Sequence, residues 1–340
     1  MLRGPWIRQT WLAAIAGAIV GAAAVATSAP EIAPFAGREA LPIVDVHGHL
    51  DAAMSADRLI ELMDESGVRQ MVLMPRTYAG RHADGLGSDE QAARYARAHP
   101  GRFLPFVAGQ RDVLDDRDRW VHPDRVADGL LREMDAELRT HEFYGIGELI
   151  IRHYGAEGER HLRERDIPID APLMRRLADL AARHGVPLLI HAEGEPAVVA
   201  EMRTLLQQQP GTRVIWAHNC GRSSAAIIRD MLTAYPNLWC DLGGMLNAPF
   251  APYGRYWPRQ TPWMFLIEDG TGQLLPEMQA LYEAFPTRFF LGTDPAFTPA
   301  LATYDHRIAR FRQLLSDLTP ETARRLAHEN ADEMFSRRGN

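Results

Sequence analysis

The chain has few cysteines and no excess of basic residues. Only Cys220 and Cys240 occur among its 340 residues, which excludes a disulfide-rich scaffold and a cysteine-rich zinc site. We expect both to be small buried side chains, with a single bridge between them as the alternative in an oxidising compartment. Lysine and arginine total 37 against 44 acidic residues, so the net charge is −7. This charge disfavours sequence-independent binding of nucleic acid. A GxGxxG motif after a strand and a P-loop are also absent, which argues against a nucleotide-binding open sheet.

The N-terminus carries a long uncharged run. Arg3 and Arg8 precede the stretch 11–30 (WLAAIAGAIVGAAAVATSAP), which is rich in alanine and glycine. This order matches a secretory signal peptide, with Ala24-Val25-Ala26 as a small-x-small cleavage site. Since the run spans about 20 residues, an uncleaved membrane anchor is the alternative. Residues 1–29 are therefore predicted to export the protein to the periplasm or the medium, or to anchor it outside the cytoplasm.

From residue 41 onward, short apolar runs alternate with longer amphipathic stretches. The apolar runs predict strands at 43–47, 70–74, 103–107, 145–149, 187–191, 213–217, 238–242 and 288–291. The amphipathic stretches predict helices at 56–65, 88–98, 124–139, 171–183, 195–208, 223–234, 274–284 and 304–315, with a terminal helix at 321–335. Eight strand–helix pairs predict an α/β fold, a single (β/α)₈ TIM barrel over residues 41–335. An open doubly wound sheet is the second choice.

Polar side chains fall where these predicted strands end. His47 and His49 end the first strand, and alternate residues of a strand point to the same face, so the two imidazoles can converge. Four further strand ends carry Glu148 (strand four), His191 (strand five), His218 (strand six) and Asp294 (strand eight). In a barrel, the carboxyl ends of the strands lie in a ring around one opening, which we call the mouth. Imidazoles and carboxylates are typical ligands of a divalent metal, so we predict a metal site with one or two ions.

This set of residues resembles the amidohydrolase superfamily of metal-dependent barrels. The family pattern has HxH on strand one, a carboxylate or a modified lysine on strand four, histidines on strands five and six, and aspartate on strand eight. The resemblance covers residues 41–335 and is closest to the branch that also holds decarboxylases and lactonases. Glu148, in the sequence GIGEL, is instead similar to the glutamate that bridges two metals in the deoxyribonucleases of the superfamily.

The resemblance implies a role for each residue. His47, His49 and Asp294 would hold the more buried metal. His191 and His218 would hold a second ion, or His191 would join the first and His218 would contact the substrate. Glu148 would bridge two ions, or stay outside direct contact if one is bound. Zinc is the default, with manganese or iron as alternatives.

Such a centre suits hydrolysis of small molecules. A catalytic metal with an open position lowers the pKa of water towards ~7, and Asp294 is placed to take the proton. We predict a metal-dependent hydrolase that uses metal-activated water on an ester, lactone, amide or phosphoester. A non-oxidative decarboxylase of the same superfamily is the alternative.

Arginines near the predicted mouth hint at the substrate. Arg76, Arg152 and Arg222 follow strands two, four and six, and a guanidinium binds carboxylates or phosphates through two oxygens. His82 and His153 could also reach the mouth. Two long loops, 151–170 and 243–272, would cover it, the second with Tyr253, Tyr256, Trp257, Trp263 and Phe265. We expect a small-molecule substrate and no nucleic acid; the sequence leaves a homo-oligomer open.

Overall fold

All eight predicted strands are present in the computed structural model, which describes residues 41–77, 87–154, 165–246, 263–295 and 298–336. The first position holds β1 (Ile43–Asp45) and β2 (His49–Leu50), the second β3 (Val68–Thr77), and the third β4 (Phe103–Pro105), β5 (Val107–Ala108) and β6 (Gln110–Arg111). Positions four to eight hold β7 (Ile146–His153), β9 (Leu188–Ala192), β10 (Val214–Trp216), β11 (Leu238–Asp241) and β12 (Phe289–Phe290). The short β8 (Arg165–Asp166) pairs antiparallel with the end of β7.

The strands pair in parallel, in the order of the sequence. One sheet joins β1, β2, β4 and β6 to β3, and the other runs β12-β11-β10-β9-β7-β5. Backbone hydrogen bonds link the two sheets on both sides. At the third position the N–H of Phe106 donates to the carbonyl of Leu73 at 3.0 Å, and that of Val107 donates to Gly145 at 2.9 Å. The N–H of Val46 donates to Leu291 at 2.8 Å, which ties the eighth position to the first, as a (β/α)₈ barrel requires.

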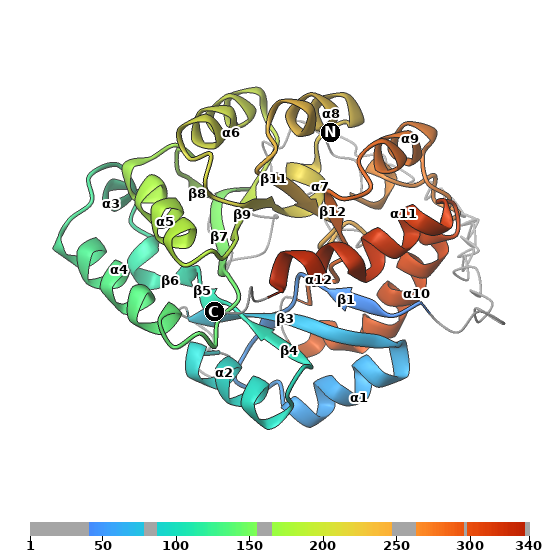
Figure 1. Ribbon diagram of the computed structural model, residues 1–340, viewed down its shortest axis with the longest axis horizontal. Helices are drawn as coiled ribbons and strands as arrows, with labels where there is room; N and C mark the ends of the chain where they lie inside the picture. The colour runs from blue at the N-terminus through green and yellow to red at the C-terminus, as the bar shows by residue number, and fades with distance from the viewer. Residues whose placement is uncertain (1–40, 78–86, 155–164, 247–262, 296–297, 337–340) are drawn as a thin grey trace, which may run out of the picture. The chain divides into compact units, whose positions relative to one another are not determined.

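Each predicted helix is also present, and the helices lie outside the strands (Figure 1). They are α1 (Ala56–Ser66), α2 (Asp89–Ala98), α4 (Arg125–Leu138), α5 (Pro172–Arg183), α6 (Pro196–Gln208), α8 (Ala225–Ala234), α9 (Pro276–Ala284) and α10 (Tyr304–Leu315). The terminal helix is divided into α11 (Pro320–Arg324) and α12 (Asn330–Phe335) by a π-helical turn, Arg325–Glu329. A short α3 (Arg117–Val121) and three 3₁₀ turns, Asp112–Leu114, Trp263–Leu266 and Thr298–Thr303, were not predicted. Among the described residues, no helix is both long and apolar enough to cross a membrane.

Two layers of apolar side chains hold these elements together. The larger layer lies between strands and helices, where α5 buries Leu173, Leu177 and Leu180. The smaller layer fills the interior of the parallel sheet with side chains such as Val44, Val46, Phe106 and Leu189, and Met334 and Phe335 of α12 belong to it. Strands buried on both faces are apolar at consecutive positions, which is why runs such as Leu188–Ile190 were recognisable in the sequence.

The two cysteines and the segment after β10 depart from prediction. Cys220 and Cys240 are both buried, as expected, and they form the single disulfide bridge that was the alternative. Helix α8 begins at Ala225 rather than at Ser223, and α7 (Ala217–Arg222) precedes it with left-handed backbone angles.

The predicted export segment at residues 1–29 and most of the second loop, 247–262, lie outside the described residues.

Candidate metal centre

The six predicted ligands come together at the carboxyl ends of the strands. They are His47, which follows β1, His49 in β2, Glu148 in β7, His191 in β9, His218 in α7, and Asp294, which follows β12. Five of the six are buried, and the side chain of Asp294 keeps 18% of its exposure. Asp294 is therefore the member of the set most accessible to solvent.

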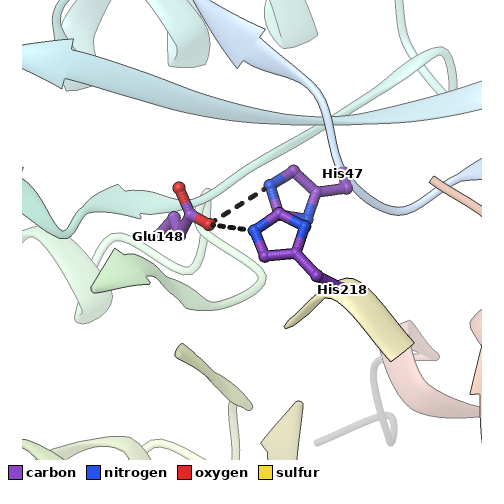
Figure 2. A group of neighbouring side chains, drawn as sticks. All are labelled: His47, Glu148 and His218. Atoms are coloured by element: carbon purple, nitrogen blue, oxygen red, sulfur yellow. Dashed lines mark ion pairs between the residues drawn. The ribbon is translucent and has the colours of Figure 1, made fainter. Parts of the chain in front are cut away.

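Glu148 lies at the centre of the group. Its Oε1 is 3.5 Å from Nε2 of His47 and 3.3 Å from Nε2 of His218, the two residues drawn with it in Figure 2. The same oxygen is 3.1 Å from Nδ1 of His191, while Oε2 is 3.4 Å from Nε2 of His49. One carboxylate thus faces all four imidazoles, which come from three strand positions, the first, fifth and sixth. This placement fits a carboxylate ligand of a divalent cation.

The geometry meets the requirements of a divalent cation. Two groups of three residues, His47 with Glu148 and His218, and His47 with His49 and Asp294, each bring their ligand atoms within 4.8 Å of one another. The Nε2 atom of His47 is buried and has no hydrogen-bond partner, although it points into the centre of the group. A buried imidazole nitrogen without a donor or acceptor is costly in protein but is suited to a metal. The side chains present therefore fit the ion that the sequence predicts.

The histidines are oriented by contacts on their far sides. Nδ1 of His218 lies 2.7 Å from the carbonyl oxygen of Gly243, which only accepts, so Nδ1 carries the proton and Nε2 keeps its lone pair. Nδ1 of His47 lies 3.1 Å from Oδ2 of Asp241, which leaves its Nε2 directed at Glu148. Carboxylates and carbonyls in this role fix the tautomer of a metal-binding histidine and raise its basicity.

Three residues that contact the predicted ligands were not themselves predicted from the sequence. Asp241 ends β11, at one of the strand positions to which the sequence assigned no ligand, and its Oδ1 also accepts from the N–H groups of His218 and Gly243. Gln110 donates from Nε2 to Oε2 of Glu148 at 2.9 Å. Glu193 lies 3.1 Å from Nε2 of His191. All three lie at strand ends, the signal that identified the ligands, and Glu193 lies two residues after one of them.

The backbone places Asp294 beside the first histidine pair. Its N–H donates to the carbonyl of His47 at 2.7 Å, and its φ of 52° turns the chain sharply after β12. Arg307 donates from Nη1 to the carbonyls of Thr293 and Asp294 at 2.8 and 2.9 Å, which holds this turn. The carboxylate then lies 3.3 Å from Nε2 of His49.

The charges of the group shift the pKa values of its members. Burial would raise the pKa of Glu148 and of Asp294, but the surrounding histidines outweigh it and hold both pKa values below their usual range. Burial would likewise lower the pKa of His47, yet Asp241, Asp294 and Glu148 raise it to about 10. Both carboxylates are consequently ionised at neutral pH, which is the form that binds a divalent cation.

The three arginines proposed as substrate contacts differ in their surroundings. Arg222 is buried and forms an ion pair with the buried Glu193. Arg152 pairs with Asp166 of β8 and lies 3.5 Å from Glu201 of α6. Arg76 is half-buried near the end of β3. A substrate anion at Arg152 or Arg222 would compete with carboxylates already in place. A substrate contact at any of the three arginines stays a prediction.

The remaining predicted substrate contacts are two histidines and the aromatic residues of the second loop, and the structure describes only some of them. His153, at the end of β7, is buried with its ring centre 5.1 Å from that of His191, and burial holds its pKa well below the usual range. Phe265 of the second loop is 44% exposed. His82, Tyr253, Tyr256 and Trp257 lie outside the described residues.

Comparison with known proteins identifies the family. The family model described as amidohydrolase matches residues 44–337. The chain belongs to this amidohydrolase family. The sequence contains no lysine, since all 37 residues counted as lysine or arginine are arginine, so a modified lysine cannot serve as a metal ligand in this amidohydrolase.

Solved structures of the same fold include both hydrolases and decarboxylases. A candidate 2-pyrone-4,6-dicarboxylic acid hydrolase from Pseudomonas putida is 16% identical, with a TM-score of 0.54 over 87% of this chain and 97% of its own. A dihydroxybenzoic acid decarboxylase from Polaromonas sp. JS666, with bound manganese and the inhibitor 2-nitroresorcinol, is 13% identical, with a TM-score of 0.52 over 86% and 96%. An amidohydrolase from Burkholderia multivorans with bound zinc is 14% identical, with a TM-score of 0.53 over 86% and 98%. No match was found among curated proteins. At these identities the likeness shows the fold and leaves the reaction open.

Proposed function

We propose that this amidohydrolase is a metal-dependent hydrolase that acts on a small-molecule ester, lactone, amide or phosphoester. The observation that carries the proposal is the position of Glu148, whose two oxygens face His47, His191 and His218 on one side and His49 on the other. A carboxylate in this place suits two adjacent ions, and paired ions are a common arrangement in hydrolases that act on phosphoesters and amides.

The proposed ligand sets follow from the distances. His47, His49 and Asp294 would hold one ion, His191 and His218 a second, and Glu148 would contact both. Nδ1 of His191 lies 2.8 Å from Nε2 of His218, so these two nitrogens converge as ligands of one ion do. Zinc is our first choice, and manganese is the alternative suggested by the decarboxylase with that metal bound.

The chain's own residues account for proton transfer. A divalent ion, when bound, supplies a Lewis acid that polarises an oxygen and lowers the pKa of water towards ~7. The Asp294 carboxylate is the most exposed member of the group, and its low pKa keeps it ionised, so that it can serve as the acceptor for the proton of the attacking water. It would then return this proton to the leaving group. If one ion is bound instead of two, Nε2 of His218, whose Nδ1 is held by the carbonyl of Gly243, would contact the substrate.

Decarboxylation is the second candidate function. Its support is the shared fold of the manganese-containing decarboxylase, in which an aromatic inhibitor is bound. That reaction would require a carboxylate-bearing ring near the predicted arginines of the mouth, Arg76, Arg152 and Arg222. A site that takes up one ion per chain, with Glu148 not in contact with it, would favour this reading.

Metal stoichiometry and a substrate panel test the proposal together. The purified protein is expected to bind two equivalents of zinc or manganese and to hydrolyse at least one member of a panel of lactones, aryl esters and phosphoesters. Substitution Glu148→Gln keeps the shape of the side chain and removes its charge. We expect it to lose one metal equivalent and to lower kcat/KM by about 100-fold or more.

The control is Glu277→Gln, which removes an exposed carboxylate on α9 and should change neither quantity. One equivalent in the wild-type protein, release of CO₂ from a hydroxybenzoate and no hydrolysis would overturn the hydrolase proposal in favour of the lyase.

We also propose that the protein acts outside the cytoplasm. Its support is the N-terminal pattern at residues 1–29, with cleavage after Ala26 or retention as an anchor as the two options. The proposed partner is a small-molecule substrate, with a homo-oligomer left open. Sequencing the N-terminus of the mature protein from the cell envelope decides between cleavage and anchoring.

A further inference from the structure

The segment that carries His218 has an unusual backbone. In α7, drawn beside β11 in Figure 1, φ is 59° at His218, 52° at Asn219, 51° at Cys220 and 72° at Gly221, with ψ between 30° and 60°. Arg222 follows with φ of 58°. Five successive residues thus have left-handed backbone angles.

Such a turn is unfavourable for most of the residues that form it. Side chains other than glycine place Cβ close to the following carbonyl in this conformation, so left-handed residues normally occur singly and are mainly glycine or asparagine. Gly221 and Asn219 suit the turn, but His218, Cys220 and Arg222 do not. The surrounding structure must therefore supply the contacts that keep it.

The contacts that hold the turn run mainly to β11 and to Gly194, two residues after β9. Cys220, the middle residue, is joined by the disulfide to Cys240 of β11. The next residue, Asp241, accepts from the N–H of His218 at 3.2 Å. On the other side, the N–H of Gly194 donates to the carbonyl of Gly221 at 2.7 Å. The disulfide is the one covalent link among these contacts.

The turn aims two side chains at the candidate metal centre. Its first residue, His218, directs Nε2 to Glu148 at 3.3 Å. Its last residue, Arg222, forms the buried ion pair with Glu193, which in turn lies 3.1 Å from Nε2 of His191. Both histidines proposed for the second ion therefore depend on this short segment.

We propose that the Cys220–Cys240 disulfide is a positioning element of the metal centre: it keeps the left-handed turn in place, so that His218 faces Glu148 and Arg222 holds Glu193 against His191. The proposal rests on the proposed metal-dependent function and adds to it the residues that set the affinity of the second ion.

Metal titration of disulfide variants tests the proposal. Metal-free wild-type protein and the pair C220A/C240A are titrated with Co²⁺, whose visible absorption reports ligand geometry, and Zn²⁺ affinity is measured against a competing chelator. We expect C220A/C240A to bind the second equivalent about 10- to 100-fold more weakly, with an altered Co²⁺ spectrum. Wild-type affinity and spectrum in this variant would overturn the proposal.

A second pair separates the backbone conformation of the turn from the disulfide itself. In C220G/C240A the disulfide is also absent, but glycine accepts a φ near 51° without a Cβ clash. Its affinity for the second ion should recover towards the wild-type value. A deficit that persists in C220G/C240A at the level of C220A/C240A, with both variants folded, would show that the backbone of the turn is not what the disulfide controls.

The control Leu177→Ala lowers stability at a buried position of α5 outside the site. It should leave the Co²⁺ spectrum unchanged, which separates positioning from a general loss of stability.

The outcomes also separate the proposal on the disulfide from the hydrolase proposal. A wild-type protein that binds two ions and hydrolyses nothing in the panel defeats the hydrolase proposal, while the variant titrations still decide the role of the disulfide.

Discussion

His47 is the side chain where the separate parts of the site meet. Its Nδ1 contacts Asp241 at 3.1 Å, and its Nε2 lies 3.5 Å from Glu148 and 3.8 Å from Asp294. The ring therefore connects a carboxylate that orients it with two carboxylates on the metal side. A metal ligand with several contacts depends on the residues that orient it. Those residues therefore affect metal affinity as the ligands themselves do.

Asp241 should be such a partner. The substitution Asp241→Asn leaves one acceptor oxygen where the carboxylate now serves Nδ1 of His47 and the N–H groups of His218 and Gly243. We expect the affinity for zinc to fall about 10- to 100-fold, measured by chelator competition. Asp269→Asn, at an exposed carboxylate that caps a turn through Thr271, is the matched control. Equal zinc affinities in the two variants would contradict the assigned role.

At the scale of elements, the ends of β11 and β12 require glycine because the first strand approaches them closely. A Cβ at Gly243 would lie 2.5 Å from Nδ1 of His47, and one at Gly292 would lie 2.6 Å from Cβ of the same residue. Contacts this short do not occur between real side chains, so an added methyl group must displace the ring or the strand.

Gly243→Ala should therefore impair both folding and metal binding. We expect the free energy of unfolding to fall by about 1–3 kcal/mol, the usual cost of overpacking, and zinc binding to weaken with it. Urea unfolding and metal titration measure the two effects. Gly211→Ala serves as the control, because a Cβ at Gly211 meets no atom within 4 Å. A Gly243→Ala variant that matches this control would show that the strand end accommodates the methyl group.

A second contact between elements should make stability depend on pH. Arg111 of β6 pairs with Asp89 of α2 and lies 3.1 Å from Glu137 of α4. Burial and the neighbouring Asp89 raise the pKa of Glu137 from 4.5 to about 7. Because the folded-state pKa is raised, this carboxyl group favours folding below pH 4.5, and the contribution is lost as the pH rises through about 7.

We expect the free energy of unfolding to depend on pH differently in the wild-type protein and in Glu137→Gln. Between pH 5 and pH 8, the wild-type protein should lose unfolding free energy relative to Glu137→Gln, which does not titrate. Urea unfolding of both proteins at several pH values, at one fixed metal concentration, measures this difference. Parallel profiles would mean that Glu137 titrates alike in the folded and unfolded chains.

At the scale of the whole molecule, the ligands tie distant parts of the chain together. They come from strand positions one, four, five, six and eight, so an ion held by them connects residues from His47 to Asp294. An unfolded chain offers no such site, and metal binding therefore adds to folding stability.

Removing the metal should lower the thermal stability of the protein. At a free metal concentration 100 times Kd, one ion contributes about 2.7 kcal/mol to the free energy of unfolding. We expect a chelator to lower Tm and zinc or manganese to restore it, measured by differential scanning calorimetry. Glu148→Gln should show a smaller shift. An identical Tm with and without metal would contradict binding at this site.

Much of the architecture could be predicted because its signals are local. A strand buried on both faces is apolar along its length, and an outer helix repeats its apolar residues at helical spacing, so the strands and the main helices were recognisable. The six strand-end residues followed from the same pattern. Helix ends and short turns were less accurate, as at α3 and the start of α8, where few residues carry the signal.

The sequence by itself determined the alternation of strands and helices, the placement of six polar side chains at strand ends, and the resemblance to a metal-dependent family. Only the tertiary structure decided how those side chains are held. The contact of Asp241 with His47, the ion pair of Glu193 with Arg222 and the disulfide at Cys220 join residues far apart in the chain or on neighbouring strands. The physical reason is that periodicity records which face of an element is buried, whereas the partner that a buried polar group finds depends on the packing of the neighbouring strands.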